Sequence, residues 1–298
     1  MNKIPVLGTV SRAFGFLIGD IVTIIRLAWA PLLASALLQY YFGGEIMQAA
    51  LQTTQNSDPT RMMAYMPQQF LMGLVQFLAG IIALVVLLRV VIFGDRKPGL
   101  FVYLWFGGAE IRIVAVSILL LIAIIAGFIG VAIVFGLLGA LASQVPVLGI
   151  AVGILAIVAV FVVLWIVLRL TLISPVIVAE SGLGVERSWA LMKGNALRMF
   201  LILLLTFIPL TIVSWLVFVA ALGGDFPAFP DIFSGMAKPG NQAEIQAAIN
   251  QWQTQLMQAY SKHWLVLNVL GFIYNLVSTA LVAGLTGSAY VAASGKNG

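Results

Sequence analysis

The 298-residue chain contains no cysteine, a single histidine (His263) and few charged residues, which make up 8% of it. Without thiolates the chain forms no disulfide, no zinc–thiolate site and no cysteine nucleophile. One histidine is too few for a histidine-based metal site and gives little basis for a Ser-His-Asp triad. We therefore predict a non-enzymatic protein with no catalytic residue, no cofactor and no metal site.

The scarcity of charge accompanies a large excess of hydrophobic residues, which are 62% of the chain and give a mean hydropathy of +1.11. A soluble domain averages roughly 45–50% apolar and about 25% charged residues. The composition thus excludes a soluble globular enzyme, a disordered chain and a coiled coil, and it indicates a polytopic membrane protein. The net charge of +5 then reports orientation and contact with anionic lipid headgroups, and no nucleic-acid partner is expected.

Long uncharged stretches predict the membrane spans. The longest, residues 113–168, exceeds the roughly 20 residues that one helix needs to cross a bilayer. The polar pair Ser143-Gln144, followed by Pro146, divides this stretch into a tight hairpin of two helices. We predict an all-α membrane protein, a single polytopic domain over residues 1–298, with short interfacial amphipathic helices and six transmembrane helices at about 21–42, 69–93, 112–141, 147–172, 199–224 and 264–292.

The positive residues predict the orientation of these spans. Twelve of the 15 Lys and Arg fall at the two termini, in the loops 94–111 and 173–198, or at the span ends beside them. The opposite side receives three: Arg61, Lys238 and Lys262. Because cytoplasmic loops carry the excess of Lys and Arg, both termini should be cytoplasmic, in a multi-pass protein of the bacterial inner membrane.

The loop 173–198 carries the candidate functional residues. Pro175 should end or kink the fourth span, Gly182 and Gly184 should break the chain, and residues 185–193 should form a short amphipathic helix. Glu180 is expected to pair with either Arg187 or Arg198. The loop is either a connector of two spans or an elbow that binds anionic headgroups or a partner, and its candidate residues are Arg169, Pro175, Glu180, Gly182, Arg187, Trp189, Lys193 and Arg198.

The outer loops carry helix signals of their own. Asp58-Pro59 is a helix start, and the segment after it gathers Met62, Met63 and Met66, which pack flexibly or, alternatively, bind Cu(I). Asn241 and Glu244 form a capping box that opens an amphipathic helix over 242–260, expected to lie against the membrane or the outer ends of the spans. His263 should be a polar anchor beside Trp264.

Glycines recur in the third and fourth spans at spacings that allow close helix approach. We expect them to serve tight packing of these two spans inside the monomer in preference to a dimer interface. They are Gly127, Gly130, Gly136 and Gly139 in the third span and Gly149 and Gly153 in the fourth.

Residues 169–198 resemble a known family. The matching residues are Arg169, Pro175, Glu180-Ser181-Gly182, Arg187-Ser188-Trp189-Ala190-Leu191-Met192-Lys193-Gly194 and Arg198. The stretch resembles the YciC-like inner-membrane proteins of bacteria and the glycerophosphoryl diester phosphodiesterase membrane domain. The resemblance implies a six-span module with cytoplasmic termini and a role in envelope maintenance. The phosphodiesterase activity of fused relatives is not implied, since the chain lacks their soluble barrel and its metal-binding acids.

Two functions remain open from the sequence. The first is a non-enzymatic envelope-maintenance module or accessory subunit of a larger membrane complex, with partner membrane subunits. The alternative is a transporter or scramblase of lipid or a small amphiphile, since the basic surface could contact membrane lipids. No Asp or Glu falls in the middle of a predicted span, which disfavours an ion-coupled pump. A transporter needs a polar-lined path between helices, whereas an accessory protein needs an apolar face for its partner.

Overall fold

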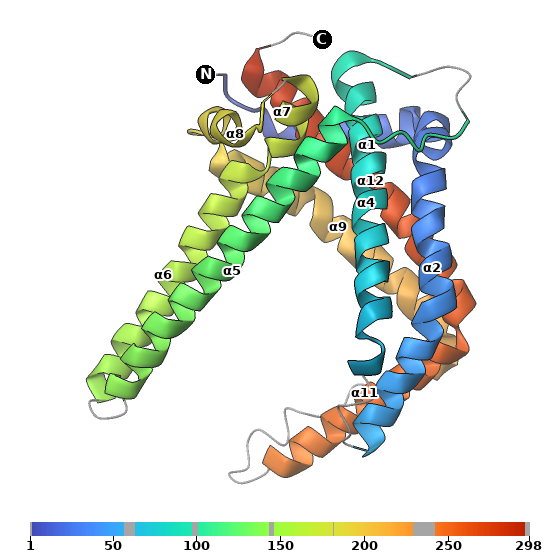
Figure 1. The fold of residues 1–298 in the computed structure, drawn as a ribbon, viewed down its shortest axis with the longest axis vertical. Coiled ribbons are helices and arrows are strands. Elements are labelled where there is room, and N and C mark those ends of the chain that lie inside the picture. Colours follow the sequence, from blue (N-terminus) through green and yellow to red (C-terminus); the bar gives the residue numbers. More distant parts are fainter. Residues whose placement is uncertain are drawn as a thin grey trace. The chain divides into compact units, whose positions relative to one another are not determined.

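A computed structural model describes residues 2–56, 63–96, 101–142, 146–180, 182–228 and 242–295. Within these ranges the chain forms helices and no strand, as predicted (Figure 1). The helices are α1 (Val6–Gly19), α2 (Ile21–Asn56), α4 (Met66–Phe93), α5 (Gly108–Ala142), α6 (Pro146–Leu170), α7 (Ile173–Ala179), α8 (Val185–Leu191), α9 (Ala196–Leu222), a 3-10 turn η1 (Gly223–Asp225), α11 (Gln242–Lys262) and α12 (Trp264–Ser294).

Six helices of the described part are long and apolar enough to cross a membrane. They begin at Ile21, Met66, Gly108, Gly149, Ala196 and Trp264, so the six predicted spans are confirmed. The amphipathic segments predicted at 185–193 and 242–260 are helical as well, as α8 and α11. The 14-residue helix α1 was not predicted, because its apolar run is too short to span a membrane.

By its internal contacts the chain divides into two compact units. Unit 1 comprises Met1–Leu27, Leu84–Thr206 and Ala280–Gly298, and unit 2 comprises Ala28–Ala83 and Phe207–Thr279. Unit 1 holds 12 Lys and Arg against 5 Asp and Glu, a net charge of +7, while unit 2 holds 3 against 5, a net charge of −2. The 12 Lys and Arg that the sequence assigned to one side of the membrane are thus the 12 of unit 1, and the other three belong to unit 2.

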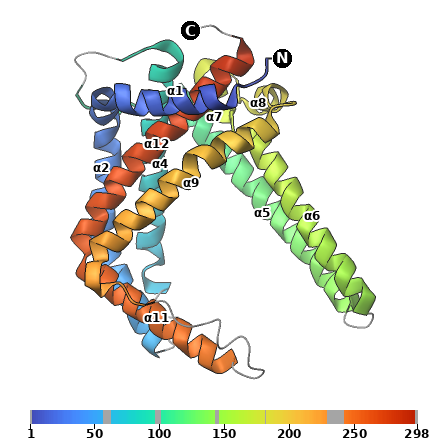
Figure 2. The same cartoon turned by 180° about the vertical axis from the view of Figure 1, so that it is seen from behind.

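In unit 1, two glycines of α12 allow helices to approach closely. A Cβ atom at Gly284 would lie 3.0 Å from the Cα atom of Ala13, and one at Gly287 would lie 2.7 Å from Cγ1 of Val91. Helix α1 accordingly runs across α12, and α4 packs beside it (Figure 2). Asn2 and Gly295 also lie together, because a Cβ atom at Gly295 would be 3.0 Å from Nδ2 of Asn2. The two ends of the described chain thus meet within unit 1.

In unit 2, the end of α9, the helix α11 and the start of α12 share one apolar cluster. Its buried members are Leu222, Ala259 and Leu267, with Leu256 and Tyr260 packed against them. The predicted placement of the amphipathic helix against span ends is therefore observed in unit 2. Its predicted cap residue, Asn241, lies outside the described residues.

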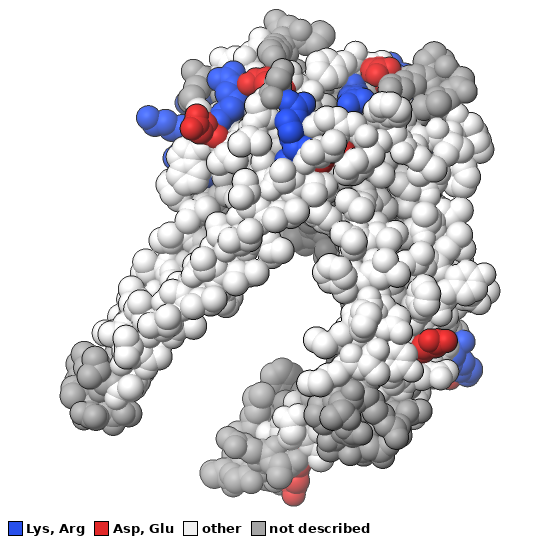
Figure 3. Space-filling view, in the orientation of Figure 1, with Lys and Arg blue, Asp and Glu red and all other residues white. Residues whose placement is uncertain are grey.

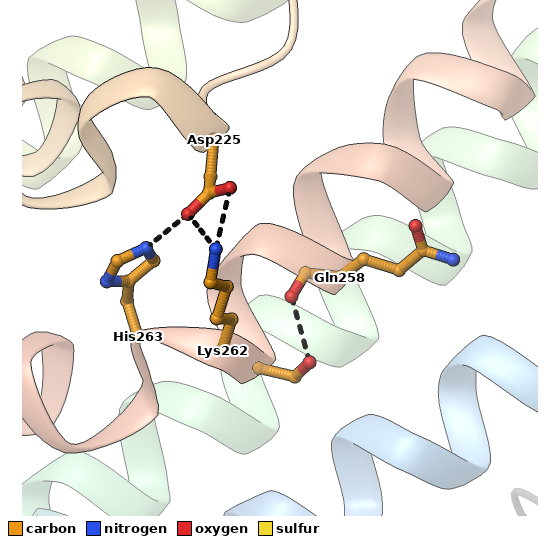
Figure 4. Close-up of polar contacts among 5 residues, drawn as sticks. Asp225, Gln258, Lys262 and His263 are labelled. Carbon is orange, nitrogen blue, oxygen red and sulfur yellow. Dashed lines mark hydrogen bonds and ion pairs between the residues drawn. The ribbon is translucent and has the colours of Figure 1, made fainter.

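His263 is a polar anchor in unit 2, as predicted (Figure 4). Its Nε2 atom lies 2.8 Å from Oδ2 of Asp225, and Nζ of Lys262 contacts both carboxylate oxygens of Asp225 at 2.9 and 2.7 Å. The adjacent Trp264 donates from Nε1 to the carbonyl oxygen of Tyr40 at 3.0 Å. These contacts attach the junction of α11 and α12 to α2 and to the turn after α9.

Helices α5 and α6 of unit 1 lie side by side (Figures 1 and 2). The predicted turn at Ser143-Gln144-Val145 lies outside the described residues, and Pro146 begins α6. The prediction that glycines mediate the packing of these two spans is wrong. Within the described part of the chain none of the six contacts the neighbouring helix, because a Cβ atom added at each would meet no atom within 4 Å outside its own turn: Gly127, Gly130, Gly136, Gly139, Gly149 and Gly153. The spacing places Gly127 with Gly130 on one side of α5 and Gly136 with Gly139 on the opposite side, and it does not show which helix either side meets.

Candidate functional site

The elbow, defined here as residues 169–198, belongs entirely to unit 1 and begins where Pro175 prevents one continuous helix. A proline ring inside a helix collides with the carbonyl four residues earlier, here that of Thr171. The chain therefore leaves helical geometry after Leu170 and restarts as α7 at Ile173, with Pro175 in the first turn, where its missing N–H is not needed. The predicted break of the fourth span is confirmed, and Pro175 itself is buried.

Gly184 makes the turn from α7 into α8. Its φ is +78°, a left-handed conformation that favours glycine, and a Cβ atom there would lie 3.0 Å from both the Ile173 carbonyl oxygen and Cγ1 of Ile177. Both constraints exclude a side chain. Gly182 is exposed and lies in the connecting segment without a positive φ, so the decisive break falls at Gly184.

Glu180 pairs with Arg187, which decides between the two partners left open by the sequence. Nε of Arg187 lies 3.4 Å from each carboxylate oxygen of Glu180. The fully buried Tyr290 of α12 donates its hydroxyl to Oε1 of Glu180 at 2.8 Å. Arg198 does not reach Glu180, and its Nη1 atom donates instead to the carbonyl oxygen of Ile4 at 3.0 Å.

The buried Asn195 binds the N-terminal segment to the elbow. Its Oδ1 atom accepts the N–H of Ile4 at 3.1 Å, and its Nδ2 atom donates to the carbonyl oxygens of Asn2 (3.2 Å) and Leu191 (3.1 Å). With Arg198 on the Ile4 carbonyl, both backbone polar groups of Ile4 are satisfied by side chains. Neither Asn195 nor Tyr290 was predicted as a site residue from the sequence. An asparagine just before a helix was a visible cap signal, but that signal did not indicate a bond to residue 4.

Arg169 lies against two tryptophan rings. Its Cζ atom is 4.5 Å from the ring centroid of Trp165 and 4.9 Å from that of Trp189, and the two rings meet edge to face at 5.2 Å. Arg169 Nη1 lies 3.5 Å from the Trp189 carbonyl oxygen, and Ser188 donates to the Arg169 carbonyl oxygen at 2.9 Å. The structure therefore joins α6 to α8 through a cation–π stack.

The eight candidate residues do not form one cluster. Arg169 meets Trp189, Glu180 meets Arg187, Arg198 turns to the N-terminal segment, and Lys193 is exposed. Lys and Arg side chains, with Asp and Glu among them, lie over the end of unit 1 that carries α7 and α8 (Figure 3). The surface of the elbow is therefore electropositive even though most of its polar groups are used internally.

A second set of contacts in unit 1 surrounds the loop before α5. Arg89 donates to the hydroxyl of the buried Tyr103 at 3.2 Å. Burial raises the pKa of Tyr103, an effect that Arg89 opposes and that Glu110 and Asp95 reinforce. The hydrogen bond between Arg89 and Tyr103 therefore serves to hold the loop before α5 in place.

The described ranges offer little to a metal ion. No three His, Cys, Asp or Glu side chains gather there in a way that could hold one. Met63 and Met66 of the outer methionine segment are exposed, and Met62 lies outside the described residues.

A comparison of this chain with protein-family models, with curated proteins and with solved structures finds no match in any of the three.

Proposed function

We propose that this chain is a non-enzymatic multi-pass protein of the bacterial inner membrane, with both termini cytoplasmic, that acts as an accessory subunit of a larger membrane complex. The observation that carries the proposal is the α5–α6 hairpin, whose open glycine faces suit the transmembrane helix of a partner subunit. A role in envelope maintenance, implied by the resemblance of the elbow, is compatible with this activity.

The hairpin is exposed to an unusual degree. No residue in the most apolar part of α5 or of α6 is buried, whereas 39% of the corresponding residues of α4 are. Small residues on membrane helices let backbones approach closely and favour helix association by van der Waals packing. An added Cβ atom would meet nothing within 4 Å at any glycine of three pairs, which therefore leave room for another helix: Gly127 and Gly130, Gly136 and Gly139, and Gly149 and Gly153.

The elbow supports the same view. Three of its polar side chains, those of Asn195, Glu180 and Arg198, hold the N-terminal segment, α7, α8 and α12 together within unit 1. This arrangement suits a rigid platform that carries the hairpin. The alternative, a lipid transporter, would need a polar lining, and between Arg112 and Arg169 the hairpin has only Ser117, Ser143 and Gln144 as polar side chains besides Trp165.

Site-specific photo-crosslinking in native membranes tests the proposal. A benzophenone amino acid would replace Phe128 of α5 or Phe161 of α6, both exposed, and Phe70 of α4 would be the matched exposed control. We expect adducts with another polypeptide from the two hairpin positions and none from Phe70. The substitution Gly130→Leu, which meets no atom of this chain within 4 Å at Cβ, should abolish them. Adducts only with lipid, or only within the chain, would overturn the proposal.

A further inference from the structure

Within the part of the chain that the structure describes, Arg169 has no ionic partner and uses little of its hydrogen-bonding capacity. Among the described residues no carboxylate lies within 4 Å of the Arg169 guanidinium, its Nε atom is buried without a hydrogen-bond partner, and its one hydrogen bond is the 3.5 Å contact to the Trp189 carbonyl oxygen. A guanidinium has five N–H donors in a fixed fork. Most of its hydrogen-bonding capacity is therefore unused.

The two indoles hold this cation without neutralising it. Cation–π attraction places the guanidinium over the rings of Trp165 and Trp189, and most of its N–H groups have no hydrogen-bond partner among the described residues. The rings themselves are partly open, with 44% of Trp165 and 36% of Trp189 exposed. The Arg169 cation is thus held in a fixed place, and the partly exposed rings of Trp165 and Trp189 lie beside it.

The position of the stack in the fold indicates which anion it meets. Arg169 lies in the last turn of α6, directly after a span without charge, and tryptophans at such ends lie at the level of the lipid headgroups. Arginine matches the geometry of a phosphate group through two parallel N–H···O bonds. A phosphate at this depth belongs to a lipid whose glycerol and upper acyl carbons can lie against the exposed indoles.

We propose that Arg169, held against the rings of Trp165 and Trp189, binds the phosphodiester group of an anionic phospholipid in the adjoining leaflet. The other two arginines of the elbow do not share this role, because Arg187 is paired with Glu180 and Arg198 is bonded to the Ile4 carbonyl oxygen. The site depends on the cation–π stack of unit 1 and is independent of any partner on the hairpin.

Native mass spectrometry of the purified full chain, titrated with phosphatidylglycerol, tests this site. The variant Arg169→Gln removes one positive charge from the stack. The matched control Arg12→Gln removes one positive charge from an exposed position of α1 in the same unit. We expect Arg169→Gln to weaken phosphatidylglycerol binding about tenfold, as for the loss of a charge-assisted hydrogen bond. Arg12→Gln should weaken it less than about twofold, as expected of a screened surface charge.

Arg169→Lys separates geometry from charge and covers the case in which the glutamine variant does not fold. It keeps the charge but loses the fork, so an intermediate loss of lipid binding supports the site. A parallel titration with inorganic phosphate distinguishes a free anion from a headgroup. Equal lipid binding by the wild type and Arg169→Lys, equal losses in Arg169→Gln and Arg12→Gln, or binding of inorganic phosphate with unchanged lipid binding in Arg169→Gln would each overturn the proposal.

Discussion

The hydroxyl of Tyr290 donates a 2.8 Å hydrogen bond to Oε1 of Glu180, although 110 residues separate them in the chain. Glu180 is also the ionic partner of Arg187. The end of α12 is thereby attached to both sides of the turn between α7 and α8. The carboxylate of Glu180 thus joins three segments of unit 1. These two contacts give Glu180 a structural role that requires no bound ligand.

Replacing Tyr290 with Phe should destabilise the protein. The variant keeps the buried ring and removes the bond to a charged acceptor, which contributes about 1.5 kcal/mol or less here because Glu180 is partly exposed. Thermal unfolding in detergent measures the change. Tyr274→Phe, on the same helix and partly exposed, should leave stability unchanged, and an equal effect of both substitutions would contradict the role given to the bond.

Replacing Asn195 with Ala should release the N-terminal segment. The variant leaves the buried N–H of Ile4 without an acceptor, at a cost of about 1–3 kcal/mol. Hydrogen exchange should then accelerate in residues 2–9, while exchange in α11 stays as it was. Asn250→Ala, at an exposed position of α11, provides the control. Unchanged protection of residues 2–9 in Asn195→Ala would show that α1 holds the segment unaided.

Replacing Gly284 with Ala should destabilise the crossing of α1 and α12. The added methyl group would lie 3.0 Å from a backbone atom of Ala13, so one helix must shift, at a cost of about 1–3 kcal/mol. Gly271→Ala on the same helix meets no atom within 4 Å and should be neutral or stabilising, since alanine is the better helix former. Thermal unfolding of the pair measures the difference, and the reverse order of stability would refute this packing.

Replacing Leu256 with Asp should destabilise the apolar cluster of unit 2. The leucine packs against Leu222, Ala259 and Leu267, and its burial contributes about 1.5 kcal/mol or more. Gln255→Asp adds the same charge at the neighbouring exposed position of α11. If thermal unfolding shows the two variants to be equally stable, then α11 does not depend on this contact.

Single cysteines should report the orientation directly, because the chain has no native cysteine. Thr60→Cys, Gln144→Cys and Gly240→Cys should react with a membrane-impermeant thiol reagent added outside the inner membrane. Gly298→Cys should react only after the membrane is opened. The reason is the 12-to-3 distribution of Lys and Arg between the two sides. Labelling of Gly240→Cys only from the cytoplasmic side would show that the orientation is the opposite of the predicted one.

Much of the fold followed from the sequence, because the property that creates a span is local. Apolar side chains over roughly 20 residues favour a membrane helix wherever they occur, so all six spans could be placed from composition along the chain. The short helix after Gly184 and the helix before His263 were also predictable, since glycines, prolines and polar residues at helix starts act on their immediate neighbours. Helix α1 was missed because its burial depends on Gly284, which lies 271 residues after Ala13.

The residues of the candidate site could be selected from the sequence, but the contacts between them could not be predicted from it. Three contacts join parts of the chain that sequence spacing does not relate. Glu180 pairs with Arg187 and not with Arg198, Asn195 bonds to residues 2–4, and Arg169 lies against two indoles. The glycines of α5 and α6 show the same limit, since their spacing was correct and their predicted partner was wrong. The sequence by itself determined what crosses the membrane, because hydrophobic transfer sums along the chain. Only the tertiary structure decided which polar side chains meet, because directional bonds form between atoms that packing brings within about 3 Å.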